Sequence, residues 1–288
     1  MPSGGAYGHL IRSLVIAPEG NDIVGIDLSN IEGRVLAHYL AMAMGDHSMA
    51  DIFANGLDFH SMNVVNWGLA PGFTYEQIRD KVDATAKAAR NSAKTLLYAS
   101  LYGAGPEKIG QGDKKKGLAL LRTLEENAPA MIALKEQVWD TCARNGGVIH
   151  DFFGRRLVYR NMVPEHAMKE AKEMIEADEA NKLFSHNPKK IAKMLESRAK
   201  RQVFNSLLQG TAASVLKIIT LSVFKRRDAE GFSTRFCAPV HDELQMYSLV
   251  GETRRLKRML EEEFSMPLLT HCDIMGEAAH GKSWGETH

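Results

Sequence analysis

The chain has 288 residues, of which 44% are hydrophobic and 25% charged, close to the averages of soluble globular proteins. Its 36 Lys and Arg against 35 Asp and Glu leave a formal net charge of +1, which argues against a protein that holds nucleic acid by bulk positive charge. The composition excludes a disordered tail, a collagen and a disulfide scaffold, and no stretch approaches the roughly 18 consecutive apolar residues of a membrane helix or the apolar segment of a signal peptide.

A strand followed by helices opens the chain. Residues 22–27 (DIVGID) form a short apolar run that ends in an acidic residue, which predicts a strand. Apolar side chains at helical spacing over 31–39 predict a helix that ends before Gly45. A further helical pattern covers 75–102, with room for one break, and Gly103 stops it.

The middle of the chain combines helices with one hairpin. Residues 118–144 are again helical in pattern, and 146–159 predict a β-hairpin because short apolar runs flank a glycine turn. The stretch 165–200 is dense in Glu and Lys, with little apolar periodicity until Ile191, which is typical of a solvated helical excursion.

The last part of the chain returns to strands. A strong apolar face predicts a helix over 201–225, and 235–249 predicts a hairpin with an acidic pair at its turn. A helix over 252–264 and a final strand near 268–274 close the chain. Strands at both ends with a helical block between them predict an α+β fold.

The three cysteines are odd in number and widely spaced. Cys142, Cys237 and Cys272 form no C-x-x-C pair, so a thiolate metal site and a disulfide framework are both poor interpretations. We expect reduced, buried thiols in a cytoplasmic protein that has no association with a membrane.

Acidic residues at two predicted strand ends are candidates for metal ligands. Asp27 ends the first strand, where a helix cap is the simpler interpretation. His241, Asp242 and Glu243 lie at the predicted hairpin turn, where they are either plain solvated residues or, paired with Asp27 across a sheet, ligands for two divalent cations. Hard oxygen ligands select Mg²⁺.

Two helical stripes carry further candidates. Arg90, Lys94, Tyr98 and Tyr102 are spaced by four and share one face, so the cations can meet a triphosphate and the rings a nucleoside; a surface stripe is the alternative. A second stripe has Arg, Asn and Gln at the same spacing, and such side chains can donate to minor-groove acceptors common to all base pairs; plain surface polarity is the alternative. Its members are Arg201, Asn205 and Gln209.

Three segments in order resemble the polymerase motifs of family A (polymerase-I-like) DNA polymerases, and the details look most like the phage-type branch. They are DLSNIEGRVLAH at 27–38, RNSAKTLLYASLYGAG at 90–105 and VHDEL at 240–244. Smaller matches are GLDFH at 56–60, RQVFNSLLQGTAA at 201–213 and the C-terminal DIMGEAAHGKSWGETH. The resemblance covers essentially the whole chain. It implies a palm with an antiparallel sheet and an inserted, largely helical fingers subdomain, the palm at 1–45 and 200–288 and the fingers at 46–199.

The resemblance also implies a mechanism, with roles carried over by motif. Asp27, Asp242 and the Leu28 carbonyl would bind two Mg²⁺ ions, with Glu243 as the neighbouring carboxylate, and Lys94 would protonate the leaving pyrophosphate. The remaining roles follow in the same way. Arg90, Lys94 and His60 would clamp the triphosphate, Glu32 would act as steric gate beside Tyr98, Tyr102 would stack beside the templating base, and Arg201, Asn205, Gln209 and His241 would contact the primer terminus and minor groove.

The resemblance begins after the segments that usually form a thumb and an exonuclease domain. We therefore expect the catalytic part of a split or truncated polymerase that works on primer–template DNA and dNTPs with a second polypeptide supplying the thumb and the N-terminal palm. The alternatives are a non-catalytic nucleic-acid-binding remnant of the fold and a metal-dependent phosphohydrolase. A remnant has no reason to keep a whole metal site, and a simple hydrolase does not need a nucleotide-clamp helix.

Overall fold

The computed structural model describes residues 7–177 and 185–287, which fall into two units. The first unit combines Met1–His38 with Thr211–His288, and the second is Tyr39–Gly210. The chain passes between the units twice, each time within a continuous helix: α2 (Ile31–Met44) and α11 (Pro188–Ala229). The expected assignment of palm and fingers to segments of the chain stays a prediction.

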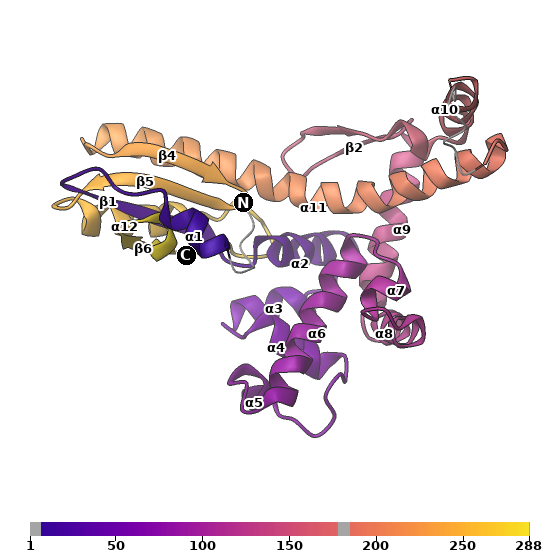
Figure 1. Cartoon of the computed structure of the whole chain (residues 1–288), viewed down its shortest axis with the longest axis horizontal. Coiled ribbons are helices and arrows are strands. Elements are labelled where there is room, and N and C mark those ends of the chain that lie inside the picture. Colours follow the sequence, from indigo (N-terminus) through magenta and orange to yellow (C-terminus); the bar gives the residue numbers. More distant parts are fainter. Residues whose placement is uncertain (1–6, 178–184, 288) are drawn as a thin grey trace. The chain divides into compact units, whose positions relative to one another are not determined.

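The first unit is built on a four-stranded antiparallel sheet in the order β4-β5-β1-β6, with α12 packed against it (Figure 1). This confirms the predicted α+β fold. The first predicted strand, the hairpin of β4 and β5 and the helix after it are all present. The elements of this unit are α1 (Gly8–Ser13), β1 (Asn21–Leu28), β4 (Arg235–Val240), β5 (Glu243–Leu249), α12 (Thr253–Glu263), β6 (Gly276–Gly281) and the 3₁₀ turn η2 (Trp284–Thr287).

Strand β1 lies inside the sheet and is buried on both faces. Ile23, Val24 and Ile26 are almost fully buried, as expected of a strand that reads as a continuous apolar run. Gly25 sits where a Cβ atom would lie 2.7 Å from the Thr287 hydroxyl oxygen and would also meet the side chain of Gln245. A residue without a side chain therefore lets η2 and β5 close over the middle of the strand.

The last strand differs from the prediction. Residues 268–274 form no strand; Leu269, Cys272 and Ile274 are buried within an irregular segment, and the polar residues between them are exposed. The buried guanidinium of Arg34 supports this segment by donating from Nη1 to the carbonyl oxygen of Asp273 at 2.6 Å. The edge strand is instead β6, whose small and polar residues gave no apolar signal because only Ala278 among them is buried.

The second unit is mainly helical, and α4, α5 and α6 lie side by side (Figure 1). Helix α2 enters it from the first unit and α11 leaves it. Its elements are α2 (Ile31–Met44), α3 (Ser48–Ala54), α4 (Phe59–Asn66), α5 (Tyr75–Arg79), α6 (Ala84–Leu101), α7 (Pro106–Ile109), α8 (Lys114–Asn127), α9 (Pro129–Arg144), β2 (Val148–His150), β3 (Arg156–Val158), η1 (Arg160–Met162), α10 (Pro164–Glu176) and α11 (Pro188–Ala229).

Local sequence explains where these helices stop. The region 75–102 is broken once, as predicted, and Asp83 caps α6 by accepting from the backbone N–H of Ala86 at 2.7 Å. The region predicted as one helix over 118–144 is two, because the residue before Pro129 cannot stay in the α conformation and Pro129 starts α9. The predicted hairpin is present as β2 and β3.

Helix α11 begins thirteen residues earlier than the predicted start at Arg201. Its first turns are dense in charge, yet Ile191 and Leu195 are buried against Ala167 and Ala171 of α10, so the charged stretch has an apolar seam. Residues 178–184 of the predicted excursion lie outside the described residues.

Two further expectations concern the thiols and membrane spans. All three cysteines are free; Cys142 and Cys272 are buried as expected, whereas Cys237 is only half-buried. Among the described residues, α11 alone contains a stretch long and apolar enough to cross a membrane, judged by length and composition only. In that stretch 44% is buried, and the core helix of a soluble protein meets the same criteria, so the finding is weak support for a membrane span.

Candidate active site

Two carboxylates lie where β1 ends and the antiparallel strand β5 begins, at the same edge of the sheet. Asp27 is exposed near the end of β1, opposite Glu243 in the ladder, and Asp242 lies in the two-residue turn between β4 and β5. The backbone N–H of Leu28 donates to the carbonyl oxygen of Asp242 at 3.0 Å, which fixes the turn against the strand end. His241 turns the chain in the left-handed region, with φ of 57°.

The electrostatics of this edge follow from its burial and charge. Burial raises the pKa of Asp242, and the neighbouring carboxylates of Asp27 and Glu243 raise it further. A divalent cation between Asp27 and Asp242 would relieve this repulsion. Mg²⁺ is commonly held by one or two carboxylates while water and substrate phosphates complete its shell. The donor set therefore fits such an ion, although no group of three or more acidic, His or Cys ligands is found among the described residues.

Glu243 is a buried residue of β5 and not a turn residue. It accepts from the indole Nε1 of Trp284 at 2.6 Å and from the amide of Gln245. The hydroxyl of Thr287 donates to Gln245 Oε1 at 3.1 Å, which extends the network into η2. Sequence reasoning missed this network; the quoted C-terminal segment contains Trp284 and Thr287, and Gln245 lies two residues after Glu243. Within this geometry Glu243 supports the strand beside Asp242.

In the second unit, Arg90 of α6 is held by Asp58 at the start of α4. Its Nε and Nη2 donate to the two carboxylate oxygens at 2.9 and 2.7 Å. Asp58 also caps α4 by accepting from the backbone N–H of Ser61 at 2.8 Å and from its hydroxyl. Burial alone would raise the pKa of Asp58, but these hydrogen bonds outweigh it and hold the pKa well below its usual value. The same pairing raises the pKa of Arg90.

The rest of the α6 stripe gathers around His60. Burial lowers the pKa of His60 to about 4, with help from the charges of Arg90 and Lys94, so the ring is neutral at pH 7. Its Nδ1 has no hydrogen-bond partner among the described residues. The His60 ring centroid lies 5.9 Å from that of Tyr98, and Tyr98 stacks on Tyr102 at 6.2 Å. Lys94 is exposed on the same face.

The sequence carries a local signal for Asp58 as a helix cap. Asp58 stands in the quoted GLDFH segment, directly before a helix, where a cap is expected. Nothing in the local pattern pairs it with Arg90, which is 32 positions away. The structure thus adds one acidic residue to the cationic stripe.

The second polar stripe lies on α11. Asn205 donates from its amide to Gln209 Oε1 at 3.4 Å, so the two share a face as the spacing predicts. Arg201 is exposed and its aliphatic part packs on Gly103, which has φ of 65°; a Cβ atom there would overlap the Arg201 side chain. The C-terminal end of α6 and this turn of α11 are therefore closely fitted.

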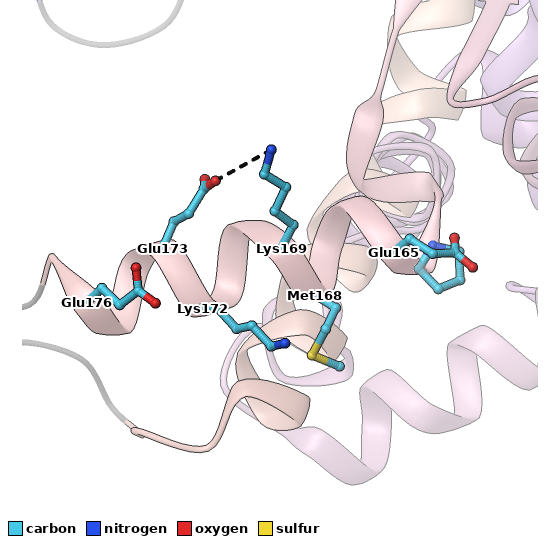
Figure 2. A pocket seen from close by; sticks show the side chains of 7 residues that line it. Glu165, Met168, Lys169, Lys172, Glu173 and Glu176 are labelled. Carbon is cyan, nitrogen blue, oxygen red and sulfur yellow. Dashed lines mark ion pairs between the residues drawn. The ribbon is translucent and has the colours of Figure 1, made fainter.

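Part of the charged excursion lines a hollow of about 610 Å³ on α10. Three glutamates and two lysines line it, and Figure 2 shows Lys169 and Glu173 joined as an ion pair, at 3.9 Å. The charges of the lining offset one another on a solvated helix. The exposed face of α10 agrees with the interpretation of 165–200 as a solvated helical excursion, whereas its buried Ala167 and Ala171 pack against α11 and do not.

The candidates thus form two groups, one in each unit. Asp27, Leu28, His241 and Asp242 meet at the sheet edge, whereas the α6 stripe, His60 and the α11 stripe belong to the second unit. Glu32 is half-buried in the part of α2 that belongs to the first unit, so its pairing with Tyr98 stays a prediction.

Comparisons with known proteins give one consistent result. The model of DNA polymerase family A matches residues 1–286. The thermostable DNA polymerase I of Thermus aquaticus is 27% identical over 96% of this chain, and DNA polymerase I of Pseudomonas aeruginosa is 24% identical over 100% of it. The chain spans 28% and 27% of the lengths of these relatives.

A solved structure shares the fold. It is described as the POL domain of Pol1 from M. smegmatis in complex with DNA primer-template and dNTP, and it matches with a TM-score of 0.76 at 20% identity. The match covers 99% of this chain and 44% of that one. These relatives and this structure are bacterial, so the phage-type branch stays a prediction.

Proposed function

Because the chain belongs to DNA polymerase family A, we propose that it performs template-directed DNA synthesis, joining a dNTP to the 3′-hydroxyl of a primer. The observation that carries the proposal is the pair of carboxylates, Asp27 and Asp242, at one sheet edge beside a turn that is tied to β1. A structural role alone does not explain why two like charges are held together there.

In this proposal Asp27, Asp242 and the Leu28 carbonyl hold two Mg²⁺ ions. Bound there, the ions would lower the pKa of the primer hydroxyl and neutralise the triphosphate and the leaving pyrophosphate. The chain's own contribution is placement. The backbone hydrogen bond from Leu28 to Asp242 holds the turn that carries Asp242 beside the end of β1 that carries Asp27. The buried Glu243 ties β5 to the η2 turn by accepting a hydrogen bond from the indole of Trp284.

The α6 stripe binds the incoming nucleotide. Arg90 keeps donors free for phosphate oxygens while Asp58 occupies its Nε and one Nη2 hydrogen, and His60 contributes a neutral N–H donor. Lys94 is exposed and positively charged, so it can donate a proton to the leaving pyrophosphate. Tyr98 stacks beside the sugar.

The steric gate and the DNA contacts complete the assignment. Glu32 fills the space that a ribose 2′-hydroxyl would need, which selects dNTPs. Tyr102 stacks beside the templating base, and its exposure suits that role. The polar stripe of α11 and His241 donate to the primer terminus and the minor groove; the stripe comprises Arg201, Asn205 and Gln209. The solved neighbour, described with primer-template DNA and dNTP, supports both ligand classes.

We further propose that more polypeptide takes part in the reaction, either within a longer protein or as a separate chain. The chain spans 28% of the Thermus aquaticus relative, and its net charge of +1 leaves little bulk attraction for a duplex. A thumb supplied by that polypeptide would grip the phosphate backbone. Binding of primer–template by this chain alone is then weak and sensitive to salt.

Primer extension with Mg²⁺ tests the proposal, with this chain alone and with the polypeptide encoded beside it. Extension that stops when the metal is chelated supports the proposal. No extension under either condition, with duplex binding retained, identifies a nucleic-acid-binding remnant. Release of phosphate from dNTP without any primer growth identifies a phosphohydrolase.

A further inference from the structure

A hollow of about 550 Å³ in the first unit lies outside the proposed reaction. It is formed by α12, the turn after β5, the start of β1 and the end of β6. Three cations line it from one face of α12, because Arg254, Lys257 and Arg258 stand three and four positions apart. The exposed side chains of His280 and Val250 complete this surface, which we call the α12 patch.

The two carboxylates of the lining are already engaged. Asp22 accepts from the Lys282 ammonium at 2.6 Å and from the Thr253 hydroxyl at 2.8 Å, and these bonds hold the pKa of Asp22 below its usual value. Glu261 accepts from the backbone N–H of Ala278 at 3.4 Å. A cation outside the lining thus neutralises Asp22, and Glu261 alone offsets the three cations of α12. The α12 patch therefore has an excess of positive charge.

Ion pairs within the chain do not explain the three cations. In the described part of the chain neither Arg254 nor Lys257 pairs with a carboxylate. Arg258 lies 3.8 Å from Glu262, but these side chains are 76% and 50% exposed, and such a pair contributes little to stability.

Helix α12 also carries its charges against its own dipole. Its first turn has no acidic residue and its last turn no basic one, although the N-terminus of a helix favours negative side chains and the C-terminus positive ones. The glutamates at its end are explained by Arg226, which donates to Glu262 at 2.6 Å and to Glu263 at 3.2 Å. Arg255 pairs with Glu230 at 3.1 Å. No comparable contact explains the three cations of the patch, so their placement favours an anionic ligand.

The α12 patch lies at the other end of β1 from the candidate metal site. Asp22 is opposite Ser248 in the ladder, whereas Asp27 is opposite Glu243. The positions from Asp22 to Asp27 span about 17 Å of strand. A ligand on the patch is therefore remote from the reacting groups and is not the substrate of the proposed reaction.

We propose that the α12 patch docks an acidic peptide segment of another polypeptide, with its carboxylates on Arg254, Lys257 and Arg258 and an apolar side chain on Val250. Clusters of Arg side chains are a recurring means of recognising acidic motifs. Val250 is 54% exposed and Leu249 beside it 43%, which gives the segment an apolar surface to cover. The proposal goes beyond DNA synthesis and does not depend on it.

The lining favours a peptide over the backbone of a nucleic acid. Arg254 and Arg258 are about one helical turn apart, roughly 6 Å along the axis, so the patch is short for a row of phosphates. Glu261 faces the same hollow and would repel such a row, whereas the backbone N–H of a peptide can donate to it. Val250 offers a phosphate no contact but can pack against an apolar side chain.

Fluorescence anisotropy of the full chain measures docking without any need for synthesis. The probe is a labelled synthetic peptide that repeats Asp-Asp-Leu, compared with an Asp-Asp-Gly peptide of equal length and charge and with labelled oligothymidylate. We expect the Asp-Asp-Leu peptide to bind most tightly and to bind more weakly in high salt. Arg254→Glu weakens its binding about tenfold. The matched Lys225→Glu variant, an equal change of charge at an exposed site of α11 outside the patch, binds as the wild type does.

Two further measurements separate docking from folding. A glutamate at position 254 suits the dipole of α12, so the urea midpoint of Arg254→Glu does not fall although docking is lost. Val250→Ser lowers the affinity for the Asp-Asp-Leu peptide to that for the Asp-Asp-Gly peptide.

Each contrary result overturns a defined part of the inference. If neither acidic peptide binds, the patch is not a docking site, and equal binding of the two peptides removes the apolar contact. Oligothymidylate that binds at least as tightly, and is lost in Arg254→Glu, assigns the patch to nucleic acid. Equal losses in Arg254→Glu and Lys225→Glu reduce the effect to general charge, and a lower urea midpoint in Arg254→Glu gives Arg254 a structural role. Primer extension is measured separately, so a failed polymerase proposal is distinguished from a failed docking site.

Discussion

Asp58 is expected to act on nucleotide binding through Arg90, which it holds with two hydrogen bonds. The two side chains are 29% and 21% exposed, so the pair is partly shielded from water. In Asp58→Asn the amide keeps an oxygen for the Ser61 cap but loses the charge and the paired acceptor. A hydrogen bond to a charged group contributes about 1.5–3 kcal/mol, and partial exposure favours the lower end, so we expect unfolding to become easier by about 1.5 kcal/mol.

The effect on nucleotide binding comes from the position of Arg90. An unanchored guanidinium must be ordered by the triphosphate itself, so we expect the KM for dNTP to rise about tenfold, equivalent to about 1.4 kcal/mol, with a smaller change in kcat. Single-nucleotide primer extension measures both constants. Asp58→Ala additionally removes the cap of α4 and lowers the free energy of unfolding by about 1 kcal/mol more.

A double-mutant cycle with Arg90→Met checks the route of this effect. If Asp58 acts through Arg90, the double variant has the KM of Arg90→Met alone. Independent, additive increases in KM would contradict the positioning role. A lower KM in Asp58→Asn would mean that Asp58 competes with the triphosphate for Arg90, which would also refute the reasoning.

Three further outcomes are expected. Glu243→Ala leaves the indole N–H of Trp284 buried without its acceptor and lowers the free energy of unfolding by about 3 kcal/mol, whereas Glu243→Gln costs about 1 kcal/mol; equal losses in urea titrations would exclude the hydrogen bond as the cause. Burial lowers the pKa of His38 and of His60 to about 4, below the unfolded value of about 6.5. The free energy of unfolding therefore falls as the pH drops from 6.5 to 4, by up to about 3 kcal/mol for each ring. A free energy of unfolding that does not change over this pH range contradicts this. The resemblance implies that Tyr98 admits dideoxynucleotides readily and that Tyr98→Phe rejects them more strongly; chain-terminator titration measures the ratio.

The sequence predicts best where one signal dominates. The apolar run of β1 between polar ends and the motif at the β4–β5 turn were sufficient to place Asp27 at the end of a strand and Asp242 in the neighbouring turn. The spacing of α6 was sufficient to align Arg90 with the tyrosines, because a helix fixes the positions of its own side chains.

Prediction fails where a tertiary contact overrides the local pattern. The segment 268–274 is held without a strand by the burial of Leu269, Cys272 and Ile274 and by the Arg34–Asp273 hydrogen bond, which no periodicity encodes. The start of α11 is stabilised by Ile191 against α10, across a stretch that composition alone presents as solvated. Asp58 pairs with Arg90 over 32 positions, and single-sequence reasoning has no access to such distances.

The central claim is that Asp27 and Asp242 bind the metal ions of a polymerase, and one variant tests it directly. Asp242→Asn keeps the shape of the turn and removes the charge. Primer extension is measured beside primer–template affinity, in the presence of whatever polypeptide the wild type needs for activity. The account predicts that synthesis is lost while affinity for the primer–template is unchanged. Retained synthesis, or an equal loss of synthesis and affinity, would contradict it.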